Sequence, residues 1–488
     1  MGVRRIGIAC ITLALLVAGA AGGADRDLRL IDATRHDDAA AVKALVSAGA
    51  DVNARAGDGS TALHWAAQND DLALADLLIG KGAKVNAATD IGITPLWIAA
   101  NNSEAAMVQR LLDARADPNI APSTDGAPLM EAAQRGNAEA VKALLDHGAD
   151  PNAKEVSHGQ TALMWAAAEV HPDVVRLLLA AHADVHARTK TWKQRVMLCC
   201  QYYEGDDDGA AVVELGGYTP LMFAAQSGDV ESAKLILAAG ADLKDTAADN
   251  TSALILAAHA GQSATAVYLV NAGADPNDAR AGYTALHVAA TAGDLPLVTA
   301  LLAHGADPNV RVQKGSATKQ MRSGHSIDHR LMGATPFILA ACNGHLDVMK
   351  LLVSKGGDPT ITTLDSRTAI MAMAGRGTQT QQGDKVPETR VVQAVKLAAQ
   401  LGTPVDHADA NGDTALHIAA TRRRDAIVQA LADSGATLNV RDHDGLTPLA
   451  AALKPPASAK GSGLSDDYEY LLKHTGTAQL LRKLGATT

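Results

Sequence analysis

The stretch Thr284–Asn309, TALHVAATAGDLPLVTALLAHGADPN, determines the fold. It predicts two short helices joined by a tight turn and followed by a second turn. Thr284 is placed to cap the first helix, and Gly293 supplies the left-handed residue that ends it. Asp294 starts the second helix, and Gly305 ends it. Leucine, valine and alanine recur at helical spacing, so each helix has one apolar face. A unit of this size cannot bury that face alone and needs copies of itself on either side.

Copies of this unit fill most of the chain. Their starting positions are Leu28, Thr61, Thr94, Ala127, Thr161, Thr219, Ser252, Thr284, Thr335, Thr368, Thr414 and Thr447. The basic step between them is about 33 residues. Three of the steps are longer, and each excess is an insertion. Because every unit of such an array contacts only its neighbours, the array can grow beyond the size of a compact domain.

The repeated motif resembles that of the ankyrin-repeat family. Its Thr-Pro-Leu-His-x-Ala-Ala pattern stands as TALHWAA at Thr61, TPLWIAA at Thr94, TPLMFAA at Thr219, TALHVAA at Thr284 and TALHIAA at Thr414. The outgoing turn stands as GADVN at Gly49 and as GADPN at Gly148, Gly273 and Gly305. The resemblance implies an all-α solenoid of about twelve helix-turn-helix units, caps included, over residues 25–488. It also implies hairpin fingers that line a concave binding surface together with the first helices.

Departures from the motif predict local differences between units. The motif histidine is kept only at His64, His287 and His417. An imidazole there can hydrogen-bond the cap or the turn, so we expect some of the hairpins without it to be less tightly tied. Arg115 and His182 stand where the other units have a glycine at the end of the second helix, which predicts a modest backbone strain.

The N-terminus and the charge limit the class of protein. Residues 1–24 combine Arg4 and Arg5 with a short apolar run and small residues, which is typical of a secretory signal peptide. A short uncleaved anchor is the alternative, although the run is too short to cross a bilayer. We expect a periplasmic or secreted protein without a membrane segment after cleavage. The net charge of −10 and the scattered basic residues argue against nucleic acid as a partner.

The first of two finger insertions, residues 190–217, is rich in aromatic side chains. The candidate partner-binding residues in it are Trp192, Arg195, Tyr202 and Tyr203, in a chain that is only 3% aromatic. Aromatic and arginine side chains are common anchors of protein interfaces. The alternative is that these aromatic residues form a small core that holds the insertion against the stack.

The second finger insertion, residues 311–333, is basic within an acidic protein. Its candidate partner-binding residues are Arg311, Lys319, Arg322 and Arg330. It could bind an acidic partner or fold back onto acidic fingers. A third insertion, residues 375–388, falls between the two helices of its unit, and residues 447–488 form a modified C-terminal cap.

Residues that could carry chemistry are few. We assign no metal site and no cofactor, although His325 and His329 are spaced to share one face of a helix. Cys199 and Cys200 could form a vicinal disulfide or a redox pair, or lie buried in an apolar patch. The sequence therefore predicts a non-catalytic, monomeric scaffold that binds another protein. The alternatives are a metal-dependent sensor or enzyme with its site in the insertions, and a secreted effector-type scaffold.

Overall fold

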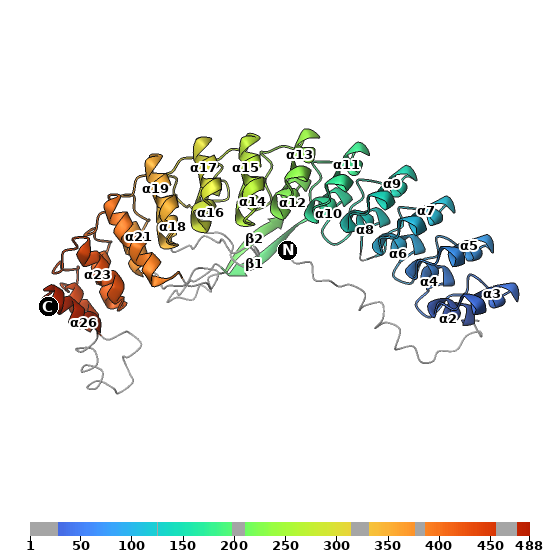
Figure 1. Cartoon of the computed structure of the whole chain (residues 1–488), viewed down its shortest axis with the longest axis horizontal. Helices are drawn as coiled ribbons and strands as arrows, with labels where there is room; N and C mark the ends of the chain where they lie inside the picture. Colours follow the sequence, from blue (N-terminus) through green and yellow to red (C-terminus); the bar gives the residue numbers. More distant parts are fainter. Residues whose placement is uncertain (1–27, 124, 198–209, 314–330, 376–385, 455–475) are drawn as a thin grey trace, which may run out of the picture. The chain divides into compact units, whose positions relative to one another are not determined.

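The computed structural model describes residues 28–123, 125–197, 210–313, 331–375, 386–454 and 476–488. Within these ranges 24 helices follow one another in pairs, and one two-stranded sheet is inserted among them (Figure 1). The chain divides into two compact units. Unit 1 comprises Met1–Trp192 and Glu214–Ala248, and unit 2 comprises Lys193–Val213 and Asp249–Thr488.

The helix pairs of unit 1 stack in two rows. The first helices of the pairs are α2 (Arg29–Arg35), α4 (Ala62–Gln68), α6 (Pro95–Asn101), α8 (Pro128–Arg135), α10 (Ala162–Ala168) and α12 (Pro220–Ser227). The second helices are α3 (Ala39–Ser47), α5 (Leu72–Gly80), α7 (Ala105–Asp113), α9 (Ala138–Asp146), α11 (Pro172–Ala180) and α13 (Val230–Ala238). Each first helix packs against the first helix of the next pair, and α5 through α13 do the same in the second row.

The helix pairs of unit 2 repeat this arrangement. The first helices are α14 (Ala253–His259), α16 (Ala285–Ala292), α18 (Pro336–Cys342), α20 (Ala369–Gly375), α22 (Ala415–Thr421) and α24 (Pro448–Leu453). The second helices are α15 (Ser263–Asn271), α17 (Leu295–Ala303), α19 (Leu346–Ser354), α21 (Glu388–Gln400), α23 (Asp425–Asp433) and α26 (Gly476–Leu484). Neighbouring helices of each row are in contact. The predicted solenoid of helix-turn-helix units is therefore confirmed within each unit.

Hydrogen bonds fix the starts of the first helices. The Thr94 hydroxyl accepts the backbone N–H of Trp97 at 3.2 Å, as an N-cap residue does. In the histidine-bearing units the ring also takes part. The N–H of Thr284 donates to Nδ1 of His287 at 3.0 Å, so Nε2 carries the proton and donates to the Val310 carbonyl of the next turn at 3.0 Å. Burial lowers the pKa of His287 to about 4, so the ring is neutral at pH 7 and keeps both bonds.

Loss of the motif histidine does not always loosen the next hairpin. His64 and His417 make the same tie as His287, to the carbonyls of Ile93 and Leu446. At Trp97 another side chain makes the same tie. The indole Nε1 of Trp97 donates to the carbonyl of Gly126 at 3.0 Å. An indole N–H can therefore replace an imidazole N–H in holding the following finger.

Nine described residues other than glycine have positive φ, and they include both of the positions predicted at the end of a second helix. Arg115 has φ 68° and His182 has φ 62°, which confirms the predicted strain. Val170, between α10 and α11, has φ 65° and was not anticipated. A β-branched residue is the more costly of these, because its branched Cβ crowds the backbone at positive φ.

The first finger insertion contains two strands, β1 (Thr191–Met197) and β2 (Ala210–Gly216), which pair as one sheet. The described chain is therefore mostly helical, as the predicted solenoid requires, with this one small sheet added in the insertion. The two legs of a finger already run side by side, so strand pairing extends them. Gly216 is required at the base, because a Cβ there would lie 2.1 Å from the carbonyl oxygen of Lys190.

Several predicted features lie outside the described residues. They are the signal peptide of residues 1–24, Cys199, Cys200, Tyr202, Tyr203, Lys319, Arg322, His325, His329 and Arg330. The third insertion was predicted as residues 375–388; α20 ends at Gly375 and α21 begins at Glu388. Of the helices that the structure describes, none is long and apolar enough to cross a membrane.

Candidate functional site

The fourth residue of each first helix, from α4 to α12, defines a surface of unit 1 that we call the first-helix stripe. Its members are Trp65, Ile98, Glu131, Trp165 and Phe223. Helices that pack side by side lie about 8–10 Å apart, so residues at equivalent positions of neighbouring helices form a row. Trp65, Glu131 and Trp165 are half-buried, while Ile98 and Phe223 each expose 8% of their surface. Three of the five members of the stripe are thus large side chains that the stack covers only in part.

Tryptophan is concentrated in unit 1. All four tryptophans of the chain, namely Trp65, Trp97, Trp165 and Trp192, belong to this unit. Trp97 is 7% exposed and is used by the fold, since it holds the next finger. The ring of Trp65 lies 5.1 Å below the guanidinium carbon of Arg35, a cation–π contact. Trp65 and Trp165 therefore remain as the tryptophans of the stripe that could contact another molecule.

Further aromatic rings gather where α10 and α12 begin. The ring of Trp192 stands edge-on to His158, with the ring centroids 6.2 Å apart. Tyr218 stands edge-on to Phe223 of the stripe, with the centroids 6.1 Å apart. Trp192 packs on a finger residue and still exposes 36% of its surface, and Arg195 is exposed on the same strand. The structure therefore places these two predicted residues on an accessible part of the insertion.

Two fingers of unit 1 expose apolar side chains. Ile91, in the finger before α6, is 54% exposed, and Val156, in the finger before α10, is 59% exposed. Apolar side chains that protrude beside a partly covered aromatic row mark an interaction surface better than scattered ones do. In unit 2 the equivalent helix positions are all aliphatic, and five of the six are buried while Ile418 is half-buried; they are Leu256, Val288, Leu339, Ala372, Ile418 and Ala451.

Glu131 is the charged member of the stripe. Burial first and the nearby Asp125 second raise the pKa of Glu131 to about 7, while Arg135 acts in the opposite direction. Arg135 lies one turn further along α8, but its Nη2 donates to Oδ1 of Asn101 on α6 at 2.9 Å. A carboxylate in this position is thus partly desolvated, and Arg135 acts on it through its charge without forming an ion pair with it.

Arginine secures the base of both finger insertions, which sequence reasoning missed for the first one. Nη1 of Arg188 donates to the carbonyls of Gly217, at 3.0 Å, and Thr246, at 2.7 Å. Nε of Arg311, a predicted partner-binding residue, donates to the carbonyl of Gly333 at 3.0 Å. Arg188 and Arg311 each stand two residues after the third position of the Asp-x-Asn turn, a spacing that could have revealed the shared role.

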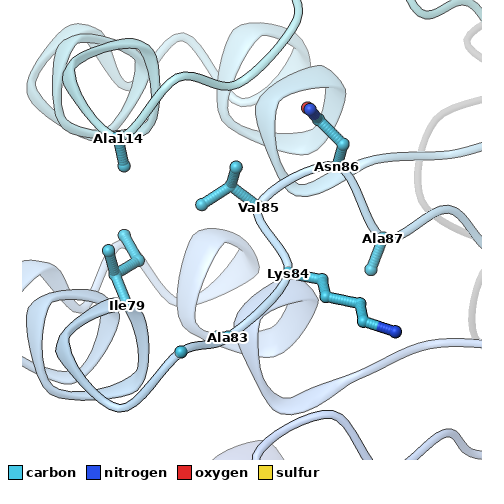
Figure 2. A pocket seen from close by; sticks show the side chains of 8 residues that line it. Ile79, Ala83, Lys84, Val85, Asn86, Ala87 and Ala114 are labelled. Carbon is cyan, nitrogen blue, oxygen red and sulfur yellow. The ribbon is translucent and has the colours of Figure 1, made fainter.

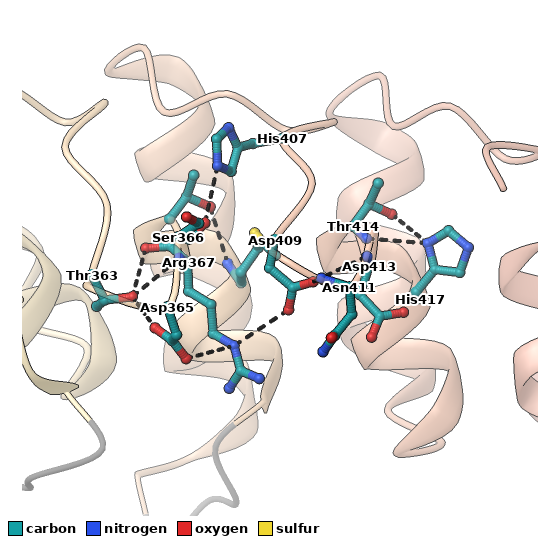
Figure 3. A network of polar contacts seen from close by, with 12 residues as sticks. Thr363, Asp365, Ser366, Arg367, His407, Asp409, Asn411, Asp413, Thr414 and His417 are labelled. Carbon is teal, nitrogen blue, oxygen red and sulfur yellow. Dashed lines mark hydrogen bonds and ion pairs between the residues drawn. The ribbon is translucent and has the colours of Figure 1, made fainter. Parts of the chain in front are cut away.

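A polar network in unit 2 ties two neighbouring fingers (Figure 3). Nε of Arg367 lies 3.1 Å from Oδ2 of Asp365 and 3.6 Å from Oδ2 of Asp409. Oδ1 of Asp409 accepts the backbone N–H groups of Asn411, at 2.9 Å, and Asp413, at 3.1 Å. Burial and the neighbouring Asp409 raise the pKa of Asp413. These carboxylates hold the turns in shape, so we infer that the network has a structural role.

One hollow of 550 Å³ lies in unit 1 near the ends of α5 and α7 (Figure 2). Ile79, Val85 and Ala114 form its apolar part, and Lys84 is the charged side chain among the lining residues. Oδ1 of Asn86 accepts the backbone N–H of Asp117 at 2.8 Å. The lining contains no carboxylate or imidazole to pair with Lys84. Across the ranges that the structure describes, no group of three His, Cys, Asp or Glu side chains could hold a metal ion.

Comparisons with known families agree with this architecture. The family model described as "Ankyrin repeats (3 copies)" matches residues 30–122, 105–189, 221–312 and 389–479, and the model "Ankyrin repeat" matches residues 332–364. The chain belongs to the ankyrin-repeat family. Ankyrin repeats generally mediate protein–protein interaction, and proteins built from them are typically non-enzymatic scaffolds.

Two curated relatives and one solved structure are similar over parts of the chain. The Caenorhabditis elegans "Ankyrin repeat and KH domain-containing protein mask-1" is 29% identical over 250 residues, which are 46% of this chain and 9% of that protein. The human "BCL-6 corepressor-like protein 1" is 34% identical over 90 residues, 18% of this chain and 4% of that protein. The chain thus spans less than a tenth of either relative. The human ASB11 ankyrin repeat domain matches with 28% identity and a TM-score of 0.40, over 50% of this chain and 96% of that domain.

Proposed function

We propose that this protein is a non-catalytic scaffold that binds a partner protein through its fingers and first helices, with the first-helix stripe of unit 1 as the anchor. The observation that carries the proposal is the pair of half-buried tryptophans, Trp65 and Trp165, on a row of helices in a chain that is 3% aromatic. Partly covered aromatic side chains bury much area at a small entropic cost when a partner docks, which is why they dominate binding energies.

The finger insertion adds to this surface. Its base carries the exposed Trp192, and Ile91 and Val156 protrude from neighbouring fingers. A partner that covers the stripe would also bury these apolar side chains, each contributing about 25 cal/mol per Å² of area removed from water.

We also propose that the protein is exported, and N-terminal sequencing of the mature protein from its native cell tests this.

Site-specific crosslinking tests the location of the surface. In one variant a photoreactive amino acid replaces Val156, in the finger before α10. In a matched control it replaces Val170, an exposed valine between α10 and α11. We expect a discrete crosslinked partner in native cells from position 156 only, and its loss when Trp65 and Trp165 are both changed to Ala. A partner that crosslinks equally from position 170, or that survives both substitutions, would overturn the proposal.

A further inference from the structure

Glu131 departs from the pattern of the first-helix stripe. The neighbouring members on the helices that pack against α8 are Ile98 and Trp165, both apolar. Glu131 is half-buried between Ile98 and Trp165 in the row of first helices. It makes no hydrogen bond or ion pair with another residue in the described part of the chain. Burial disfavours the charged form of this carboxyl group, and no donor of the described chain offsets that cost, so packing within the fold gives no reason for a glutamate here.

The charges around Glu131 leave it electronegative. Helices α6 and α10, which flank α8 in the row, contain no ionisable residue. Asp125, in the finger before α8, adds a second negative charge, and Arg135 is engaged with Asn101. In the second row, α9 packs against α8 and carries Glu139, Lys142 and Asp146. Lys142 is itself paired with Asp146. The stripe therefore has a negative point within an apolar surface.

We propose that Glu131 receives a lysine or arginine side chain of the partner, whose aliphatic part packs against Ile98 and Trp165. This inference rests on the proposed function and names the chemistry that the surface selects. Long basic side chains bury their methylene groups on apolar surface while the charged end finds a carboxylate, and an arginine can also stack on an indole ring.

The surroundings of the basic residue can also be named. Ile91 and Val156 protrude from the fingers before α6 and α10, one on each side of the finger that precedes α8. A partner segment that places its basic residue at Glu131 would therefore carry apolar residues on both sides of it. The net charge of −10 adds a long-range preference for such a segment over an acidic one.

Peptide selection on the purified full-length chain tests this chemistry. The probe is a displayed library of random peptides, and selected peptides are then measured as labelled synthetic peptides by fluorescence anisotropy. We expect enrichment of a lysine or arginine flanked by apolar residues. Changing that basic residue to norleucine or Glu131 to Gln should each weaken binding by about tenfold, since the charge-assisted hydrogen bond is lost.

Two further readouts separate recognition from a general effect on the fold. Arg135→Ala should strengthen binding of the basic peptide a few-fold, because it removes a competing cation near Glu131, whereas it should leave an uncharged peptide unaffected. Affinity of the parent chain should rise between pH 5.5 and pH 8, as Glu131 loses its proton, and Glu131→Gln should abolish that rise. A thermal melt of Glu131→Gln confirms that this variant is folded.

The outcomes distinguish the inference from the proposed function. Peptides that require Trp165 but contain no basic residue, or that bind Glu131→Gln and the parent chain equally well, would overturn the inference and leave the proposed function standing. A selection that yields only peptides indifferent to Trp65→Ala and Trp165→Ala would overturn the proposed function itself. Basic peptides that need both Trp165 and Glu131 and respond to Arg135→Ala would establish the site.

Discussion

Two tryptophans at adjacent helix positions show how one hydrogen bond separates a structural residue from one available for binding. Trp97 is buried and its indole N–H reaches the Gly126 carbonyl at 3.0 Å. Trp65 lies on the neighbouring first helix, α4, and its indole nitrogen is buried without a hydrogen-bond partner among the described residues. An unsatisfied buried donor lowers stability by about 1–3 kcal/mol. The fold alone therefore does not explain why a tryptophan stands at position 65.

Substitution by phenylalanine should therefore act differently at the two positions. Trp97→Phe removes the tie to Gly126 and leaves that carbonyl without its donor, so we expect a loss of about 1–3 kcal/mol in the free energy of unfolding. Trp65→Phe removes an unsatisfied donor and keeps an aromatic ring beneath Arg35, so it should cost less than about 1 kcal/mol. Urea unfolding followed by circular dichroism compares the two variants. Equal losses would contradict this assignment of the two indoles.

The strained valine at position 170 offers a test of backbone geometry. Val170 has φ 65° and is 49% exposed, so it gains little from packing. Asparagine tolerates the left-handed region far better, and Val170→Asn should raise the free energy of unfolding by about 1 kcal/mol. Thermal denaturation measures the effect, with Val156→Asn as an equally exposed control outside the left-handed region. A lower melting temperature for Val170→Asn would show that the valine is not strained.

The raised pKa of Glu131 predicts a pH dependence of stability. Its folded-state pKa is about 7 against an ordinary value of 4.5, so the folded chain holds this proton more tightly than the unfolded chain. The stabilisation is complete below pH 4.5 and is lost as the pH rises through 7. Glu131→Gln should therefore be more stable than the parent chain at pH 8, by about 1–3 kcal/mol, with the difference shrinking toward pH 5. Urea titrations at the two pH values measure it, and a constant difference would refute the prediction.

At the level of elements, an asparagine ladder links successive turns. The side chain of Asn119 donates to the carbonyl of Gly148 at 3.0 Å and accepts the N–H of Asp150 at 2.8 Å. Asn152 repeats these two bonds to the turn after α11. His186 occupies the asparagine position of that turn, the last before the finger insertion, so the side-chain pattern of the ladder ends there.

Restoring the asparagine should strengthen this part of unit 1. In His186→Asn the amide should reach the carbonyl of Gly240 and the N–H of Asp242, by analogy with Asn119, and raise the free energy of unfolding by about 1 kcal/mol. Asn119→Ala is the matched loss and should cost about 1–2 kcal/mol. Hydrogen exchange of the Asp242 amide provides the local measurement. Unchanged exchange in His186→Asn would mean that the turns there are not spaced as in the rest of the row.

The elements differ in how far the sequence could predict them. Helix starts follow from Thr284 and its equivalents, because a capping hydroxyl and an apolar face at helical spacing are local signals. Strand β2 was hidden, since Ala210–Gly216 becomes a strand only because β1 lies beside it. Trp65 and Trp165 were missed for another reason: their position in the motif is usually apolar and reads as core. Only Glu131, a charge at that same position, could have drawn attention to the stripe.

At the level of the whole molecule, the distribution of tryptophan allows the unfolding of the two units to be followed separately. All four tryptophans belong to unit 1, so intrinsic fluorescence reports the unfolding of that unit, whereas circular dichroism reports the helices of both. Each repeat contacts only its neighbours, and the stability of such a stack is a sum of local terms. Coincident transitions by two probes are the test of all-or-none unfolding, and we expect the two curves to differ in urea.

Two matched core substitutions make this prediction specific. Leu144 of α9 and Leu301 of α17 are both fully buried, at 0% exposure, in equivalent second helices of unit 1 and unit 2. Leu144→Ala and Leu301→Ala should each cost about 2–5 kcal/mol, because each leaves a cavity in a packed row. Leu144→Ala should lower the midpoint of the fluorescence transition, whereas Leu301→Ala should shift only the part of the dichroism curve that fluorescence does not follow. If Leu301→Ala lowered both midpoints together, the chain would unfold as a single cooperative body, and the surface of unit 1 that we propose for partner binding would depend on the integrity of unit 2.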